Sequence, residues 1–236
     1  MPNHPPLKLK VWGEHALFTR PEMKVERVSY EVMTPSAARG VLEAVYWKPE
    51  VEWRVRRIAV LNPVRHASFL RNEVNSTAAP GRLKAAFARG DDPAFFADDD
   101  RTQRHTLALR DVAYVIEADV LPRDGSHPAK HRDIFRRRVA RGQCFHRPYL
   151  GCREFAASFA EPDGTESPID RTDPLGRMLF DLRYGPGRAV PLFFHAELDR
   201  GVLHVPDALY TRLREPAPNA PEASGDGTTG AAPAAP

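Results

Sequence analysis

Apolar and polar residues alternate along several segments of the chain, which is the pattern of a β-strand with one buried face. The clearest alternating segments are residues 7–13, 51–61 and 104–121. Residues 65–74 follow a turn at Asn62 and Pro63, and we expect them to pair with the preceding strand as a hairpin. The segment 104–121 is the longest, and it is expected to bend at Arg110 and Asp111.

A first helix is predicted over residues 34–47. Thr34 is a candidate N-cap, and Pro35 suits the first turn because that turn needs no backbone donor. Apolar residues then recur at helical spacing. Pro49 restricts the backbone of Lys48 and ends the helix.

A second helix is predicted between Pro128 and Gly142, because proline suits a helix start and glycine a helix end. Its apolar stripe consists of Ile134, Phe135 and Val139. Most other positions are basic, namely Lys130, Arg132, Arg136, Arg137, Arg138 and Arg141. Such dense charge repels itself unless a polyanion neutralises it, and a phosphate backbone is the obvious polyanion. The alternative is a solvated basic face without a ligand.

The predicted order is strand, helix, strand pair, long strand, helix and strand, with the last strand in residues 150–159. This is the split βαβ pattern of a ferredoxin-like or RRM-like sheet, here with an inserted hairpin, so the fold class is α+β. Short antiparallel strands follow at residues 178–184, 190–198 and 201–205, with a hairpin turn at 199–201. We therefore expect a first domain over 1–162, a small antiparallel β-sheet domain over 163–214 and a disordered tail over 215–236.

Composition restricts the class of protein. The 236 residues carry a net charge of +3, and basic residues cluster in 52–71 and 123–153. The two cysteines make no disulfide framework, and neither a signal peptide nor a membrane-spanning segment is apparent, so we expect a cytoplasmic protein. A zinc site could combine Cys144, His146 and Cys152 with His127 or His131, but that spacing matches no common zinc pattern.

Residues 76–100 are small and acidic around a short predicted helix at 83–88, which indicates a surface insertion. Its carboxylates could bind Mg²⁺ for a metal-dependent nuclease. The residues concerned are Asp91, Asp92, Asp98, Asp99 and Asp100. A solvated acidic loop is the favoured interpretation, because loops position metal ligands poorly.

An RNA-cutting site that works without metal needs a base for the 2′-hydroxyl, a cation for the phosphorane and an acid for the leaving 5′-oxygen. Lys130 and His131 stand together at a predicted helix start, where backbone N–H groups also favour phosphate. Histidine titrates near neutrality without special help. A solvated Lys-His pair is the plainer interpretation of this dipeptide.

Four motifs resemble the CRISPR-associated protein family five, subtype d, and they occur in the same order within residues 7–205. They are RGVLEAVYW at 39–47, RTQRHTL at 101–107, DVAYVIEA at 111–118 and RGQCFHRPYLGCREF at 141–155. The resemblance implies an RRM-like domain with a small C-terminal β-sheet. It also implies a metal-independent endoribonuclease that cuts precursor CRISPR RNA at the base of the repeat hairpin and needs no cofactor.

The resemblance also implies partners. The protein would stay on the 5′ handle of the product as a subunit of the type I-C interference complex, in contact with repeat RNA and other Cas subunits. Duplex DNA is a further candidate partner, and no membrane is expected. A non-catalytic subunit that only binds the 5′ handle is the alternative from another class.

The family's catalytic set is a tyrosine at the end of the first helix and an adjacent Lys-His pair, which match Tyr46, Lys130 and His131. In this assignment Tyr46 is the base, Lys130 depresses its pKa and stabilises the phosphorane, and His131 is the acid, with His146 and His105 as alternatives. The expected RNA-binding residues are Arg136, Arg137, Arg138, Arg141, Phe145, Arg147, Tyr149, Arg54 and Arg56. Phe145 and Tyr149 could stack on bases, or else pack in the core.

Overall fold

The computed structural model describes residues 4–77, 79–91, 96–184 and 189–215; Asp92 and residues 216–236 of the expected tail lie outside these ranges. Within them, nine strands form one sheet in the order β6-β1-β5-β3-β9-β8-β7, while β2 and β4 also pair with β5. The strands are β1 (Leu7–Ala16), β2 (Arg27–Val28), β3 (Val51–Val60), β4 (His66–Val74), β5 (Arg101–Pro122), β6 (Ser158–Ala160), β7 (Asp173–Arg183), β8 (Val190–Asp199) and β9 (Val202–His204). The helices are α1 (Pro35–Val45), α2 (Pro80–Arg89), α3 (Pro128–Ala140) and α4 (Ala208–Arg214), with a 3₁₀ turn η1 (Ala97–Asp100).

Strand β5 is the centre of the sheet. Its second half lies between β1 and β3 and is antiparallel to both. Leu9, Ile116 and Ala118 from these strands are fully buried, as the alternating pattern requires. The expected bend is confirmed at Asp111, whose φ of 53° breaks the extended backbone between the two halves of β5.

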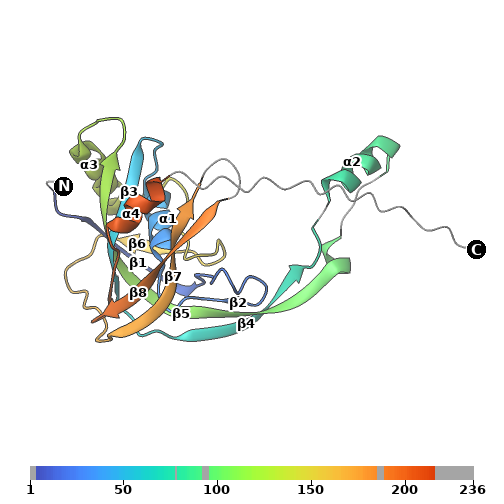
Figure 1. Cartoon of the computed structure of the whole chain (residues 1–236), viewed down its shortest axis with the longest axis horizontal. Helices are drawn as coiled ribbons and strands as arrows, with labels where there is room; N and C mark the ends of the chain where they lie inside the picture. The colour runs from blue at the N-terminus through green and yellow to red at the C-terminus, as the bar shows by residue number, and fades with distance from the viewer. Residues whose placement is uncertain (1–3, 78, 92–95, 185–188, 216–236) are drawn as a thin grey trace, which may run out of the picture.

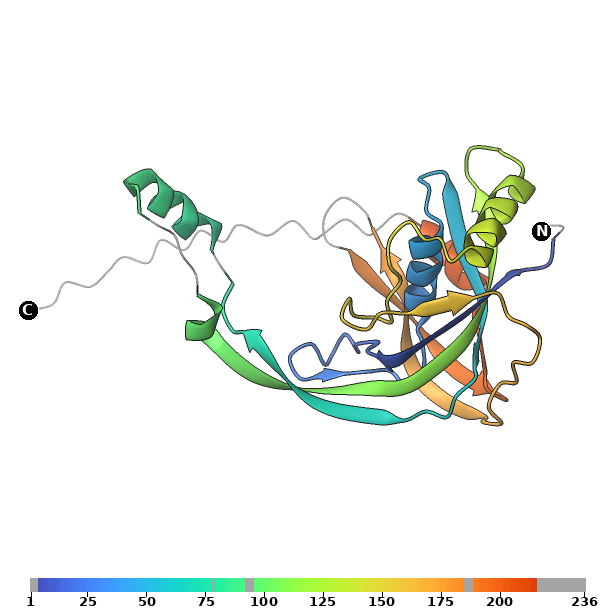
Figure 2. The same cartoon turned by 180° about the vertical axis from the view of Figure 1, so that it is seen from behind.

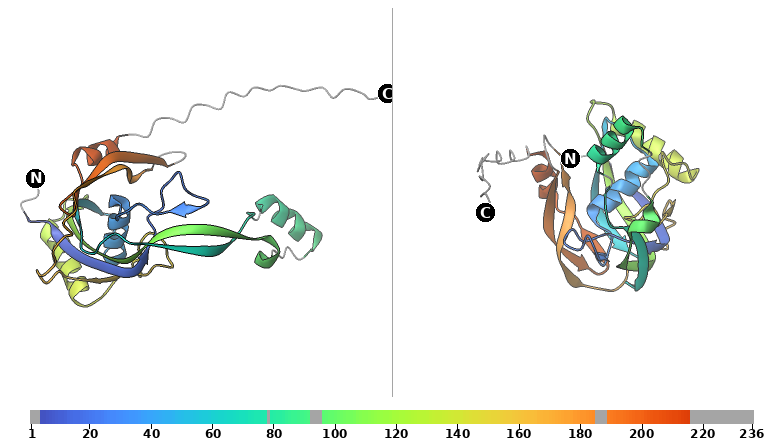
Figure 3. Two further views of the ribbon diagram at one scale, coloured as in Figure 1. Left: turned by 90° about the horizontal axis from the view of Figure 1, so that it is seen from below. Right: turned by 90° about the vertical axis from the view of Figure 1, so that its right-hand side faces the viewer.

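The first half of β5 leaves the body of the protein as a two-stranded ribbon with β4 (Figure 1). The predicted pairing of residues 65–74 with residues 51–61 is therefore wrong, because β4 pairs with β5, and β3 lies between β5 and β9. Helix α2 lies at the tip of the ribbon, as the view from below also shows (Figure 3, left), and has no buried residue. The described part of the insertion predicted over residues 76–100 is thus a surface feature.

Helices α1 and α3 form where the end signals predict them. The Thr34 hydroxyl accepts the N–H of Ala37 as an N-cap, and Gly142 follows α3 with a φ of 62°, which glycine adopts without strain. Helix α1 packs against β3 and β7 and touches α3, so the two helices meet over the sheet (Figure 2). Phe135 of α3 packs on Trp53 of β3, with ring centroids 4.8 Å apart.

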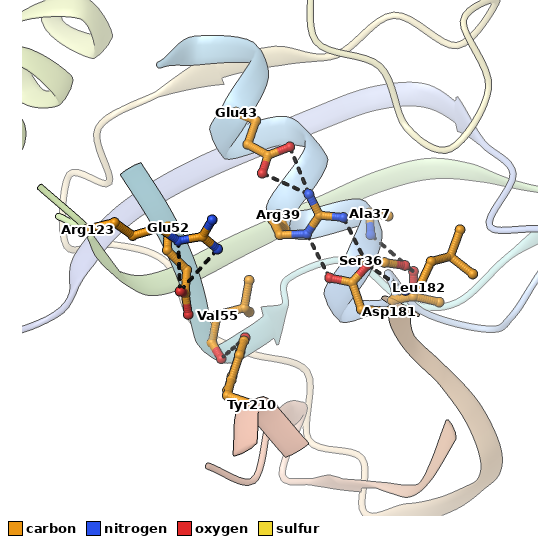
Figure 4. A network of polar contacts seen from close by, with 11 residues as sticks. Ser36, Ala37, Arg39, Glu43, Glu52, Val55, Arg123, Asp181, Leu182 and Tyr210 are labelled. Atoms are coloured by element: carbon orange, nitrogen blue, oxygen red, sulfur yellow. Dashed lines mark hydrogen bonds and ion pairs between the residues drawn. The ribbon is translucent and has the colours of Figure 1, made fainter. Parts of the chain in front are cut away.

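The C-terminal strands are antiparallel as predicted, and they join the main sheet through the pairing of β9 with β3. The hairpin turn before β9 is confirmed by positive φ values at Arg200 and Gly201. Helix α4, for which no prediction was made, donates a hydrogen bond from the buried Tyr210 hydroxyl to the carbonyl of Val55 (Figure 4). No helix in the described part of the chain is long and apolar enough to cross a membrane.

An ion pair ties β7 to α1. The guanidinium of Arg39 donates two hydrogen bonds to the buried carboxylate of Asp181, at 2.7 and 2.9 Å, and two more to Glu43 (Figure 4). Because one guanidinium serves both carboxylates, this contact holds the C-terminal strands on the helix that ends at Tyr46.

Residues 150–159 were predicted to be a strand, and most of that prediction is wrong. Only β6, Ser158–Ala160, pairs with β1 in this region. The preceding residues form a loop because Gly151 has a φ of 86° and lies against the carbonyl of Leu17, where a side chain would have no room. The Leu150 carbonyl accepts the N–H of Leu17, which fixes the loop to the body.

Candidate active site

Tyr46 ends α1. Its backbone turns to an extended conformation, and its N–H donates the last helical hydrogen bond, to Leu42. The indole N–H of Trp53 donates to the Tyr46 carbonyl at 3.0 Å, which anchors this residue to β3. The phenol ring is 1% exposed. The predicted position of Tyr46 at the end of the first helix is therefore confirmed, and its ring points inward.

His131 lies in the first turn of α3 and is fully buried. It shares a face with Phe135 and Val139, at spacings of four residues, and both of those side chains are buried. The apolar stripe predicted for this helix therefore includes the histidine. This spacing is readable in the sequence, although the predicted stripe of Ile134, Phe135 and Val139 leaves the histidine out.

The two helices bring the Tyr46 hydroxyl within 2.8 Å of His131 Nδ1. The other ring nitrogen, Nε2, lies 2.7 Å from the hydroxyl of Ser126, in the loop before α3. Burial raises the pKa of Tyr46, and the negative charge of Glu50 raises it further, against a lowering by Arg138. Burial thus outweighs the lowering by Arg138, and the expected effect of Lys130 on this pKa stays a prediction.

Arg138 connects the two helices above the phenol. Its guanidinium donates to the carbonyl of Val45 at 2.8 Å and lies 5.2 Å from the centroid of the Tyr46 ring. A cation at the C-terminal end of α1 is favoured by the helix dipole. Arg138 therefore has a packing role here, whereas the prediction placed it among the RNA-binding residues.

Four basic side chains of α3 and its C-cap are exposed: Lys130, Arg136, Arg137 and Arg141. Lys130, Arg137 and Arg141 lie on one face, at spacings of seven and four residues. Lys130 and His131 are thus adjacent in sequence but differ in environment, one in solvent and the other buried. This face is exposed, and so is Arg136, which lies on α3 outside it.

The loop that follows α3 packs against the C-terminal end of α1. The N–H groups of Phe145 and His146 both donate to the carbonyl of Ala44, at 2.8 and 3.1 Å. Phe145 is 59% exposed, and its ring lies 5.7 Å from that of the exposed Trp47. The alternative in which Phe145 and Tyr149 pack in the core is wrong, because Tyr149 is also exposed. Trp47 was not predicted to have a role.

His146 and Arg147 are exposed in this same loop; His146 directly follows Phe145, and Arg147 precedes Tyr149 by two residues. His146 is thus carried to the end of α1 that holds Tyr46. His105 lies elsewhere, in β5 opposite Leu70 of β4, in the projecting ribbon. Of the two alternative histidines, only His146 comes from a segment that contacts the helix of Tyr46.

Two arginines expected to bind RNA are occupied by carboxylates. Arg54 pairs with Glu52 and lies over the ring of Tyr210, and Arg56 pairs with Asp119 and Asp207. Because these guanidinium groups are already paired with carboxylates, Arg54 and Arg56 are not part of the candidate RNA-binding surface.

Among the residues that the structure describes, the acidic insertion contains no group of side chains arranged to bind a metal ion. The two cysteines are not part of such a group either. Asp98 pairs with Arg101, and Asp100 accepts the backbone N–H of Ser76. Cys144 is exposed, and Cys152 is partly buried. The carboxylates of Asp91, Asp98 and Asp100 are therefore used in local pairing, Asp91 with Arg89.

The chain is similar to known proteins over most of its length. The family described as CRISPR-associated protein (Cas_Cas5), subtype Cas5d, matches residues 6–206. A protein named CRISPR pre-crRNA endoribonuclease Cas5d from Thermus thermophilus is 46% identical over 227 residues, covering 88% of this chain and 94% of that protein. A protein of the same name from Mannheimia succiniciproducens is 43% identical over 215 residues, covering 85% of this chain and 94% of that protein.

Solved structures share the fold at lower identity. A crystal structure of a CRISPR-associated protein superposes with a TM-score of 0.61 at 22% identity, covering 86% of this chain and 95% of that chain. The structure of the functionally uncharacterized protein SMU1763c from Streptococcus mutans gives the same TM-score at 20% identity, covering 85% of this chain and 91% of that chain.

Proposed function

The chain belongs to the Cas5d family of CRISPR-associated proteins, and from that premise we propose that it is an endoribonuclease that processes precursor CRISPR RNA. The observation that carries the chemistry is the 2.8 Å contact between the Tyr46 hydroxyl and His131 Nδ1. A phenol with a raised pKa is a poor base on its own, but it can accept a proton while it passes its own proton to an imidazole.

The proposed reaction is attack of the RNA 2′-hydroxyl on the neighbouring phosphorus. The 2′-hydroxyl proton goes to the Tyr46 oxygen as the Tyr46 proton goes to His131 Nδ1. The bond from the 2′-oxygen to phosphorus forms, and the bond from phosphorus to the 5′-oxygen breaks. The products are a 2′,3′-cyclic phosphate and a 5′-hydroxyl, and no step requires a metal.

Lys130 supplies the exposed charge in this scheme. Its ammonium stabilises the phosphorane and gives a proton to the leaving 5′-oxygen, and exchange with solvent then returns the His131 proton to Lys130. This role for His131 differs from the acid expected from the sequence, because the ring is buried and both of its nitrogens already have partners. Because Tyr46 and His131 are both buried, RNA must displace some of the residues that cover them before the reaction can occur.

RNA binding is assigned to the exposed face around the buried pair. Arg136, Arg137 and Arg141 of α3 and its C-cap would neutralise backbone phosphates. Trp47 and Phe145 are exposed aromatic rings that could stack on unpaired bases. The same surface would also hold the 5′ handle after cleavage. The protein would then remain on the RNA as a subunit of the type I-C complex, together with other Cas proteins.

We further propose that β6, β1, β5 and β3, with α1 and α3, form a ferredoxin-like unit. Support comes from their chain order, strand-helix-strand-strand-helix-strand, and from the antiparallel arrangement β6-β1-β5-β3. In this proposal residues 1–162 carry RNA binding and chemistry, and residues 163–214 support α1 through the ion pair between Arg39 and Asp181.

The test is to mix the purified protein with its own repeat RNA in EDTA. Discrete cleavage that yields a cyclic phosphate supports the proposal. A mobility shift without cleavage would instead identify a binding subunit. Cleavage that appears only when Mg²⁺ is added back would contradict the metal-independent chemistry.

A further inference from the structure

We infer that Ser126, oriented by Asp124, is a positioning residue that fixes the tautomer of His131 so that Tyr46 donates its proton to Nδ1. The inference rests on the proposed function and extends it to two residues outside the expected catalytic set. Both lie in the loop between β5 and α3, and neither is assigned a role by the motifs that identify the family.

The first observation is that His131 is hydrogen-bonded on both nitrogens by hydroxyl groups. Ser126 Oγ is 2.7 Å from Nε2, and the Tyr46 hydroxyl is 2.8 Å from Nδ1. A neutral imidazole has one donor and one acceptor nitrogen, whereas a hydroxyl can take either part. The distances therefore allow two arrangements, which differ in the direction of every hydrogen bond.

Pairing of the Tyr46 hydroxyl distinguishes the two arrangements. If Nδ1 carried the hydrogen, it would donate to the phenol oxygen, and the Tyr46 hydrogen would need a second acceptor. Among the described residues, His131 is the hydrogen-bond partner that the buried Tyr46 hydroxyl has. An unpaired buried donor is costly, so the favoured arrangement has Tyr46 donating to Nδ1 and Nε2 carrying the hydrogen.

Asp124 favours the same tautomer of His131 from the Ser126 side of the ring. The backbone N–H of Ser126 donates to the Asp124 carboxylate at 3.0 Å, which folds the loop so that the carboxylate faces Ser126. Hydrogen bonds from the Ser126 side chain and then from its backbone lower the pKa of the Asp124 carboxyl. A carboxylate can only accept, so Asp124 offers an acceptor to the single Ser126 hydroxyl hydrogen, and in that arrangement Oγ accepts from Nε2–H.

This direction has a chemical consequence. The Tyr46 hydrogen points at His131, so the free lone pairs of the phenol oxygen face away from the histidine, where a 2′-hydroxyl proton can be received. When Nδ1 takes the Tyr46 proton, the imidazolium donates from both nitrogens, to Tyr46 and to Ser126. The carboxylate of Asp124 then lies beyond Ser126 to stabilise the new positive charge.

The experiment combines cleavage kinetics with a spectroscopic measurement of the histidine. Ser126→Ala is expected to lower the single-turnover rate on repeat RNA about tenfold with RNA affinity unchanged, because one neutral hydrogen bond is lost. Ser126→Thr keeps the hydroxyl and should restore the rate. Ser158→Ala, at an exposed position of β6, is the matched control and should cut like the unmodified protein.

Nitrogen-15 NMR of histidine-labelled protein reports the tautomer directly, and a His131→Asn sample assigns the signal. The expected spectrum has a protonated Nε2 and an unprotonated Nδ1 at neutral pH, and Ser126→Ala should mix the two forms. A protonated Nδ1 in the unmodified protein, or cleavage by Ser126→Ala at the unmodified rate, would overturn the inference. If the unmodified protein does not cut RNA, the proposed function fails, and the tautomer alone decides whether Ser126 positions His131.

Discussion

Tyr46→Phe tests whether the buried hydroxyl carries the chemistry. The substitution removes one oxygen and keeps the ring, which is anchored through its own backbone by Trp53. The Tyr46 hydroxyl is the only group removed, and His131 Nδ1 loses the partner that lies 2.8 Å away. If Tyr46 accepts the 2′-hydroxyl proton, no other group at this position can replace it.

The expected magnitudes follow from these contacts. Proton transfer by a positioned side chain contributes roughly two to four powers of ten in rate, so the single-turnover rate should fall by that amount. A buried partner left without its hydrogen bond costs about 1–3 kcal/mol in the free energy of unfolding. RNA affinity should stay near the unmodified value, because the ring is 1% exposed and contributes little surface to a ligand.

The matched control is Tyr210→Phe. Tyr210 is also buried, and its hydroxyl also makes one hydrogen bond, to the carbonyl of Val55 at 3.0 Å. Both variants should lose a similar amount of thermal stability, but only Tyr46→Phe should lose cleavage. The assay is cleavage of repeat RNA in EDTA under protein excess, with affinity and thermal midpoint measured in parallel. Cleavage by Tyr46→Phe at the rate of the control would refute the assignment of Tyr46 as the base.

Three other changes have separate expected outcomes. Lys130→Ala should slow cleavage by about two powers of ten or more with a small loss of affinity, and equal losses in rate and affinity would make Lys130 a binding residue only. Arg137→Ala with Arg141→Ala should flatten the dependence of log affinity on log salt by roughly 0.7 to 0.9 per lost phosphate contact, whereas Arg200→Gln, in the β8–β9 turn, should leave the slope unchanged. Arg39→Ala should lower the free energy of unfolding by about 3 kcal/mol, because a carboxylate of β7 stays buried without its cation, and a thermal midpoint within one degree of the unmodified value would exclude this.

The helices could be predicted because their signals are local. Thr34 and Pro35 at one start, and Pro128 and Gly142 around the other helix, act within a single turn of the backbone. The strands themselves could also be predicted, because alternation of apolar and polar residues is a local pattern. The pairing of the strands could not be predicted, because the alternating pattern of β4 fits β3 or β5 equally well. The length and bend of β5 decide between these two partners.

The candidate site divides in the same way. That Tyr46 ends a helix and that His131 starts one are local facts, and the buried face of α3 includes His131 at a helical spacing from Phe135. The distance between their side chains depends on how α1 and α3 meet over Trp53, which no local pattern encodes. Ser126 and Asp124 were missed because serine and aspartate before a helix are ordinary loop residues.

The arrangement of charge explains why binding and chemistry should respond to different substitutions. Exposed cations at Lys130, Arg137 and Arg141 face solvent, where they can meet phosphates and where salt screens them. In the proposed mechanism the buried Tyr46–His131 pair starts uncharged, which burial favours, because an unpaired buried charge is costly. Charge appears on the pair only as the proton moves, so its contribution belongs to the transition state. Substitutions on the exposed face should therefore change the salt slope, and substitutions in the buried pair should change the rate.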